Sequence, residues 1–281
     1  MEKKQIILAA AGIVVVASLF IFGRTSEPKK PMPVSMEKPA SSFDVEHFIT
    51  DAKSSLTPSQ AILVSKLENS ISRGDVAAQA VKANFSLADF WKDSAKQFVP
   101  YAFYISQASK LDNSEKNLTF AAQLFLETLR QEHDEAKLNW ETTEAIELFE
   151  KALQLDPDND DLKIGLGSCY IYGKGKNGDP QETMKGIQQL LSVVRKDSNN
   201  MKAQFVLGVG GAVSGQYDKA IERLNKVVAA QPNNLEAIVF LADTYAASGN
   251  KAEAIKWYNI SKRMKNDPLF TKEVDERMKS L

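Results

Sequence analysis

Beyond residue 42, apolar residues recur every three or four positions along the chain, and polar residues occupy the positions between them. This spacing places the apolar side chains on one face of a helix. No segment of strand length alternates strictly, apart from short ambiguous apolar runs. Helix starts also recur: Asp179 precedes Pro180, with Glu182 at the third helical position, and Thr57 and Asp267 likewise precede prolines. The pattern predicts an all-α body.

Residues 6–23 differ from the rest, because Ser18 is the only polar side chain in the run. As a helix these 18 residues would span about 27 Å, close to the hydrocarbon thickness of a bilayer. A cleaved signal peptide is the alternative, with Ala17 as a candidate cleavage position, but the apolar run continues through Phe22. No cysteine follows the run, which excludes a lipoprotein. We predict an uncleaved transmembrane anchor after a short tail, 1–5.

The orientation of this anchor is weakly specified, because two basic residues precede it and three follow it closely. Short anchors headed by lysine usually leave the N-terminus in the cytoplasm. We therefore expect a single-pass protein of the inner membrane with its body in the periplasm; the alternative places the body on the cytoplasmic face. Residues 24–42 hold four of the ten prolines and no aromatic residue, which predicts an extended tether.

The amino-acid composition of the chain argues against several classes of function. The 281 residues carry a net charge of −1, and residues 43–281 alone carry 29 basic and 33 acidic side chains. Nucleic-acid binders normally show a basic excess, so no nucleic-acid partner is expected. Cys169 is the only cysteine, and His47 and His133 are the only histidines. We expect no catalytic residues, no metal site, no cofactor and no small-molecule substrate, and composition favours a binding or structural protein.

An internal repeat organises the C-terminal part. Residues 201–234 and 235–268 abut and are equally long. Their matching pairs are Leu207 and Leu241, Gly208 and Ala242, Gly215 and Gly249, Ala220 and Ala254, and Leu224 and Tyr258. This pattern resembles the tetratricopeptide repeat family, in which small residues at positions 8 and 20 let two helices approach closely. A single hairpin cannot bury both faces, so the resemblance implies a stacked α-solenoid.

The pattern extends backwards with insertions. Gly167 and Gly186 take the two small positions of a further copy, whose turn carries about seven extra residues. Before it, we expect a helix over about 114–132, a long loop, and a second helix centred on Phe149. The predicted segments are the anchor (6–23), the tether (24–42), a divergent helical region (43–113), a degenerate repeat (114–159), a repeat with an inserted turn (160–200), two regular repeats (201–234 and 235–268) and a capping helix (269–281).

Other motifs are interpreted as packing. The glycines at 173, 175 and 178 match a GxGxxG pattern, but they follow a helix rather than a strand, so an inserted loop is favoured over a phosphate site. Gly210 and Gly211 indicate close approach by a neighbouring side chain, and Cys169 should be a buried thiol. The aromatic cluster between Phe85 and Tyr104 lacks the basic interleaving of a base-stacking surface and is assigned to the core.

The resemblance implies a ligand groove on the concave face, formed by the first helix of each pair. Its predicted residues are Asp161, Ile164, Ser168, Ile171, Tyr172, Lys202, Phe205, Val209, Ala212, Val213, Glu236, Val239, Asp243 and Ala246. With one lysine and no arginine, this set is a poor clamp for a peptide carboxylate. It fits a partner helix or an extended apolar segment of some basic character. We expect Phe205→Glu to weaken binding without unfolding the chain, unless Phe205 is buried.

These observations predict a membrane-tethered scaffold that binds other proteins or peptide segments. The layout also looks like that of single-pass tetratricopeptide repeat proteins of bacterial envelopes, such as the accessory subunit of the Sec translocon. A chaperone-like accessory of envelope protein secretion or assembly is therefore the first alternative. An enzyme hidden in residues 43–113 is a remote one.

Overall fold

The computed structural model describes residues 43–72, 77–175 and 180–281, and every regular element within these ranges is helical. The helices are α2 (Val45–Ser54), α3 (Pro58–Ser72), α4 (Ala77–Asp89), α5 (Phe98–Asp112), α6 (Glu115–Leu129), α7 (Glu135–Leu155), α8 (Asp160–Cys169), α9 (Pro180–Lys196), α10 (Met201–Val213), α11 (Tyr217–Ala230), α12 (Leu235–Ala247), α13 (Lys251–Met264) and α14 (Pro268–Lys279), with π-helical turns η1 (Phe90–Ser94) and η2 (Tyr170–Lys174). The predicted all-α class is confirmed.

The predicted anchor and tether lie outside the described residues. No helix within the described ranges is long and apolar enough to cross a membrane.

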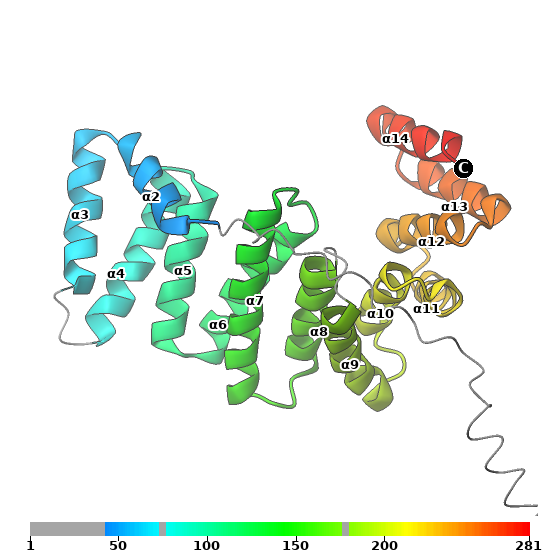
Figure 1. Ribbon diagram of the computed structural model, residues 1–281, viewed down its shortest axis with the longest axis horizontal. Helices are drawn as coiled ribbons and strands as arrows, with labels where there is room; N and C mark the ends of the chain where they lie inside the picture. The colour runs from blue at the N-terminus through cyan, green and yellow to red at the C-terminus, as the bar shows by residue number, and fades with distance from the viewer. Residues whose placement is uncertain (1–42, 73–76, 176–179) are drawn as a thin grey trace, which may run out of the picture. The chain divides into compact units, whose positions relative to one another are not determined.

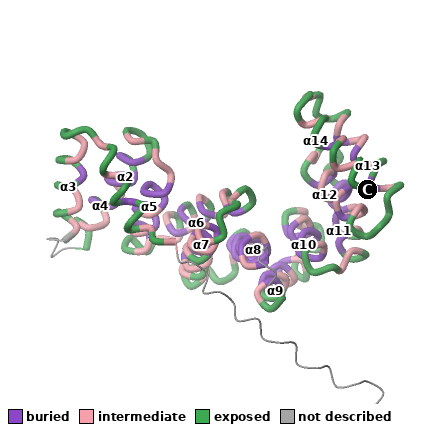
Figure 2. The backbone as a smooth tube through the Cα atoms, turned by 45° about the horizontal axis from the view of Figure 1, so that its top comes forward, coloured by how far each residue is buried: buried purple, intermediate pink, exposed green. Residues whose placement is uncertain are grey.

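Sequential helices pack as hairpins, and the hairpins stack. The pairs α4–α5, α6–α7, α8–α9, α10–α11 and α12–α13 are in contact, and each pair contacts the next through α5–α6, α7–α8, α9–α10 and α11–α12 (Figure 1). Buried residues follow the surfaces between the helices, while exposed residues follow the outer surfaces (Figure 2). This arrangement confirms the stacked solenoid, in which each pair buries the faces that its neighbour alone could not cover.

Small residues lie where helices cross. A Cβ added at Gly186 would lie 2.7 Å from the backbone oxygen of Gly167, so α8 and α9 meet at two glycines. In the next pair, a Cβ at Gly208 would lie 2.7 Å from Cγ of Leu224, and Ala220 is fully buried. The predicted small positions are therefore confirmed as the contacts that set the distance between paired helices.

Glycines also end two of the helices. Gly215 and Gly249 adopt positive φ angles of 73° and 83°, just after α10 and α12. No atom lies near either Cα in the direction of a side chain, so the backbone conformation rather than space accounts for glycine there.

The long loop predicted within 114–159 is wrong. Helix α6 ends at Leu129, and α7 already begins at Glu135, where the Asp134 side chain accepts a hydrogen bond from the Lys137 amide. The extra length is therefore in α7, which has 21 residues. The pattern concealed these turns because the buried face of α7 includes the polar Glu141 and Thr142.

The divergent region forms α2 to α5, with its aromatic residues inside. Phe90, Trp91, Tyr101 and Tyr104 are buried, and the others of the cluster pack against the same core. The pairs Phe90–Trp91 and Phe103–Tyr104 meet edge to face, with ring centroids 5.3 and 5.2 Å apart. The assignment of this cluster to the core is confirmed.

The predicted capping helix is α14, which buries an apolar stripe against the last hairpin. Val274 is fully buried, and Phe270, Met278 and Leu281 pack beside it against the last hairpin. Its Arg277 donates to both carboxylate oxygens of Asp243, at 2.9 and 2.8 Å. The capping helix therefore binds Asp243, which the sequence pattern had assigned to the groove.

Glu141 is a buried acid with an incomplete set of partners. Its Oε2 accepts a hydrogen bond from Thr128 at 2.7 Å, and Lys137 Nζ lies 3.7 Å from Oε1. Within the described residues, Oε1 has no hydrogen-bond partner. Burial raises the pKa of this carboxyl, although Thr128 and Lys137 oppose the shift. Folding therefore shifts the protonation equilibrium of this carboxyl towards the neutral form.

We expect Glu141→Met to stabilise the fold by about 1 kcal/mol at pH 7, because it removes a buried oxygen that lacks a partner. A carboxyl whose pKa is raised by folding stabilises the folded state at pH values below its pKa in the unfolded chain, which is near 4. This stabilisation is lost as the pH rises through the pKa in the folded state. Urea unfolding between pH 4 and 8 should therefore show wild-type stability falling relative to the variant. The exposed Glu222→Met serves as control. Parallel curves for wild type and Glu141→Met would contradict the assignment.

Candidate functional site

A cavity of about 670 Å³ lies on the face formed by the first helices of successive pairs. We call it the central cavity. It is lined by Glu127, Arg130 and Gln131 at the end of α6, Ile171 and Tyr172 of η2, Val209 and Val213 of α10, and Glu236 and Phe240 of α12. Apolar side chains from three elements converge with a few charged ones, which is the usual composition of a binding site.

The π-helical turn η2 shapes one wall of this cavity. The Gly175 amide donates to the Tyr170 carbonyl, five residues back, so the end of the α8 segment is wider than a regular helix. Within this turn Ile171 is fully buried, and Tyr172 is only partly covered. Ile171 packs against Gly210, where an added Cβ would lie 2.7 Å from Cδ1. The interpretation of Gly210 as a close-packing position is confirmed, and π turns are frequent at functional sites.

Arg130 spans the cavity. Its guanidinium carbon lies 4.9 Å from the ring centroid of Tyr172 and 5.9 Å from that of Phe240, and it forms an ion pair with Glu236. Burial raises the pKa of Tyr172, while the charge of Arg130 opposes this shift. The prediction of a groove without arginine is therefore wrong. Arg130, at the end of α6, lies outside the positions that the repeat pattern assigned to the groove.

A second cavity, of about 390 Å³, lies along the same helices and is called the side cavity. Its lining includes Glu115, Thr119, Gln123 and Leu126 of α6, Asp161, Leu162, Ile164, Gly165 and Ser168 of α8, Lys202 of α10, Asn159 before α8, and Phe149 of α7. Lys202 Nζ lies 3.0 Å from Asp161 Oδ1, at an exposed edge of this cavity.

The predicted groove residues are distributed between these cavities and half-buried positions outside them. Five line the central cavity: Ile171, Tyr172, Val209, Val213 and Glu236. Four line the side cavity: Asp161, Ile164, Ser168 and Lys202. Phe205, Ala212, Val239, Asp243 and Ala246 line neither. Ala246 packs against the core cluster that includes Val274 of the capping helix, and Asp243 accepts hydrogen bonds from Arg277 of the same helix.

Phe205 is half-buried between two hairpins. Its ring meets that of Phe240 edge to face, with centroids 5.5 Å apart, and it contacts the cores on both sides. A glutamate at this position would place a charge in that contact. The position favours the buried alternative, so Phe205→Glu should reduce stability and is a poor probe of binding.

Four central-cavity residues were not predicted from the sequence: Glu127, Arg130, Gln131 and Phe240. The first three lie on or just after α6, where the repeat pattern is degenerate. Phe240 lies at the sixth position of its copy, which is not a groove position of the family. The one available signal was the exposed face of α6, where Gln123 and Glu127 recur at a spacing of four.

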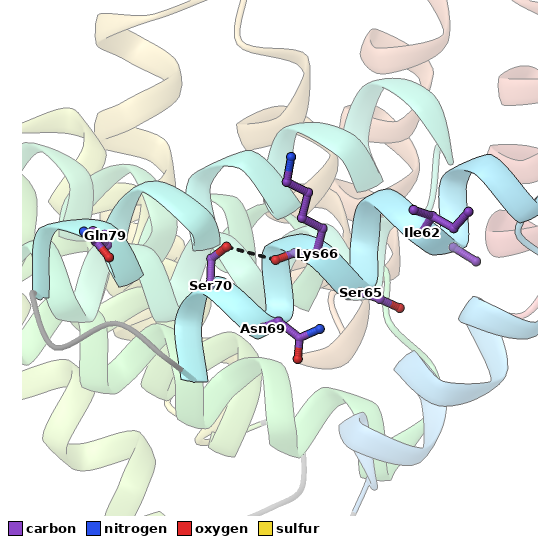
Figure 3. A pocket seen from close by; sticks show the side chains of 7 residues that line it. Ile62, Ser65, Lys66, Asn69, Ser70 and Gln79 are labelled. Atoms are coloured by element: carbon purple, nitrogen blue, oxygen red, sulfur yellow. Dashed lines mark hydrogen bonds between the residues drawn. The ribbon is translucent and has the colours of Figure 1, made fainter.

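A further cavity, of about 700 Å³, lies on α3 near the start of the described chain (Figure 3). Its lining is Ala61, Ile62, Ser65, Lys66, Asn69 and Ser70 of α3 with Gln79 of α4. Ile62 is 71% exposed, and the Ser70 hydroxyl donates to the Lys66 carbonyl of its own helix at 2.9 Å. Since a single helix supplies nearly all of this lining, few groups converge there.

The remaining candidate groups serve packing. Cys169 is fully buried, and burial raises the pKa of its thiol, as expected of an inert cysteine. Gly173 packs against Thr142, and Gly175 packs against Thr183, whereas residues 176–179 lie outside the described ranges. Across the described part of the chain, no three His, Cys, Asp or Glu side chains gather as metal ligands.

The fold of this chain is similar to that of solved tetratricopeptide repeat structures. The chain resembles the crystal structure of TTC0263, a thermophilic tetratricopeptide repeat protein of Thermus thermophilus, with a TM-score of 0.51, 17% identity, and coverage of 73% of this chain and 98% of that one. MamA from Desulfovibrio magneticus RS-1 gives a TM-score of 0.48, with 16% identity over 68% and 96% of the two chains. No curated protein sequence matches.

The sequence itself matches the tetratricopeptide repeat family model over residues 141–201 and 214–270. These ranges include α8 and α9, which meet at Gly186, and the residues of η2 and α12 that line the central cavity, whereas nearly all of α10 lies between the two ranges. Over these residues, the chain is similar to the tetratricopeptide repeat family.

Proposed function

We propose that the protein is a scaffold that binds a segment of another protein in the central cavity. The carrying observation is the convergence of Tyr172, Val213 and Phe240 from three helices that are far apart in the sequence. Val213 is 48% exposed, so an apolar surface remains open to water there. A partner that covers this surface gains hydrophobic free energy, and the tyrosine hydroxyl and the charged rim can fix its orientation.

Val213→Lys is the direct test. Val213 is the last residue of α10, where a cation suits the helix dipole, so the variant should fold normally. Peptides selected from a random displayed library against the full chain should bind the wild type and lose about tenfold or more in affinity for the variant. Fluorescence anisotropy measures both.

The matched control is Ile255→Lys, which places the same charge at an apolar residue of α13 that is 41% exposed and lies outside both cavities. It should leave the affinity unchanged. Equal losses in the two variants, or none in either, would remove the central cavity from the proposed function.

We also propose that residues 6–23 tether this scaffold to the inner membrane, with the body in the periplasm. The support is the apolar run with its single polar residue, Ser18. The full chain should remain with membranes through a carbonate wash, and deletion of residues 1–24 should release it. Recovery of a mature N-terminus at Ser18 by N-terminal sequencing would show cleavage instead.

A further inference from the structure

The two cavities are consecutive along the same helices. On α6 the lining of the side cavity ends at Leu126, and that of the central cavity begins at Glu127. Along α8 and η2, the lining of the side cavity ends at Ser168 and that of the central cavity begins at Ile171. Along α10, Lys202 lines the side cavity and Val209 lines the central cavity. The same three helices therefore supply both cavities in the same order, so that one ligand lying along them would meet both.

The spacing of the cavities sets the spacing of a ligand's side chains. Ile164 and Ile171 belong to different cavities and are seven residues apart, and so are Lys202 and Val209. At 1.5 Å per residue, each pair is separated by about 10 Å along the helix axis. A polyproline II segment has three residues per turn and rises about 3.1 Å per residue, so residues i and i+3 point the same way about 9 Å apart. Such a segment matches the spacing.

Polar side chains along α6, in the walls of both cavities, suit an extended backbone. Gln123 and Glu127 on α6 and Gln131 just past its end recur every four residues, or about 6 Å. Within the described ranges, the side-chain amides of Gln123 and Gln131 have no hydrogen-bond partner, and both residues are exposed. An extended peptide has unpaired N–H and C=O groups that these side chains can bind, whereas a helical ligand has already paired its own.

The charges of the lining favour a basic ligand. Glu115, Asp161, Glu127 and Glu236 give four carboxylates, against the two cations Lys202 and Arg130. Both cations already form ion pairs, with Asp161 and Glu236. Glu115 and Glu127 therefore remain as excess negative charge, one at each cavity.

We infer that the ligand is an extended protein segment with two apolar side chains three residues apart, flanked by lysine or arginine. One apolar side chain enters the central cavity, and the other enters the side cavity. Gln123 and Gln131 hydrogen-bond the backbone of the ligand. This inference rests on the proposed function, because the central cavity is common to both.

The test uses fluorescent, amidated peptides in which two leucines, flanked by lysines, are separated by zero to six serines. The full chain should bind the peptide with two serines most tightly, by about tenfold over the peptides with zero or five, because the second leucine is buried only at the matching spacing. An alanine-based helical peptide with leucines seven residues apart should bind more weakly. Tighter binding of the helical peptide would overturn the inference.

Gln123→Arg, at an exposed position of the side cavity, should remove the preference for spacing and lower the affinity to that of a single-leucine peptide. Thr143→Arg, at an exposed position of α7 outside both cavities, is the matched control. Val213→Lys should weaken both kinds of peptide. Binding that depends on Val213 without a preferred spacing would overturn the inference alone. A spacing preference that survives Gln123→Arg would do the same, and the absence of any Val213-dependent binding would overturn the proposed function too.

Discussion

Gly186→Leu should destabilise the protein by about 3 kcal/mol, even though leucine is the better helix former. In an open helix interior, replacing glycine by leucine would gain most of about 1 kcal/mol. At Gly186, however, the new Cβ would lie 2.7 Å from the backbone oxygen of Gly167 and 2.9 Å from Cβ of Tyr170. Neither atom is the end of a flexible side chain, so α8 and α9 must separate.

The matched control is Gln188→Leu, which places the same residue outside this contact on the same helix. It should change the free energy of unfolding by less than about 0.5 kcal/mol. Urea unfolding followed by circular dichroism measures both variants. A Gly186→Leu protein as stable as the control would mean that the two helices do not cross at these glycines.

Ala220→Trp should cost a similar amount, about 3 kcal/mol, at the crossing of α10 and α11. Ala220 is fully buried, and a Cβ added at Gly211 would already lie 3.2 Å from its own Cβ. An indole has no space there, so the hairpin must open and lose contacts with the next pair. Thermal and chemical unfolding should both report the loss.

Lys219→Trp tests whether the position or the side chain is responsible. Lys219 precedes Ala220 on α11, is exposed, and donates a hydrogen bond of 2.9 Å to the Gln216 side chain. The control should therefore remain within about 0.5 kcal/mol of the wild type. If the two tryptophan variants were equally stable, the 34-residue register of residues 201–268 would be incorrect.

Both sites matter for function as well as stability. Gly186 and Gly167 set the position of η2 relative to α9, and η2 carries Tyr172 to the central cavity. Ala220 sets the distance between α11 and α10, which carries Val209 and Val213. A variant that opens either hairpin should therefore also weaken binding, so the surface variant Val213→Lys is the cleaner probe of the cavity.

The helices, the repeat and its small positions can all be predicted from the amino-acid sequence alone. Helix starts such as Pro180 and Pro268, and stops such as Gly215 and Gly249, depend on residues within one turn of the chain. The assignment of Ala220 to a small position follows from the repeat of 34 residues, because Ala254 occupies the same position in the next copy. The stripe that docks α14 is likewise local, because four apolar residues share one face of a single helix.

Contacts between different hairpins could not be predicted in this way, because they depend on the three-dimensional arrangement of the hairpins. Arg130 and Glu236 are far apart in the sequence, and their pairing depends on how each hairpin is rotated against the next. The repeat position says which face of a helix is buried within its own pair, but it carries no information about that rotation. The same reason explains why Asp243 is bound by Arg277 and why Phe205 is covered by Phe240. The length of α7 and the π turn at η2 were hidden because buried polar residues and a wider turn leave no periodic signal.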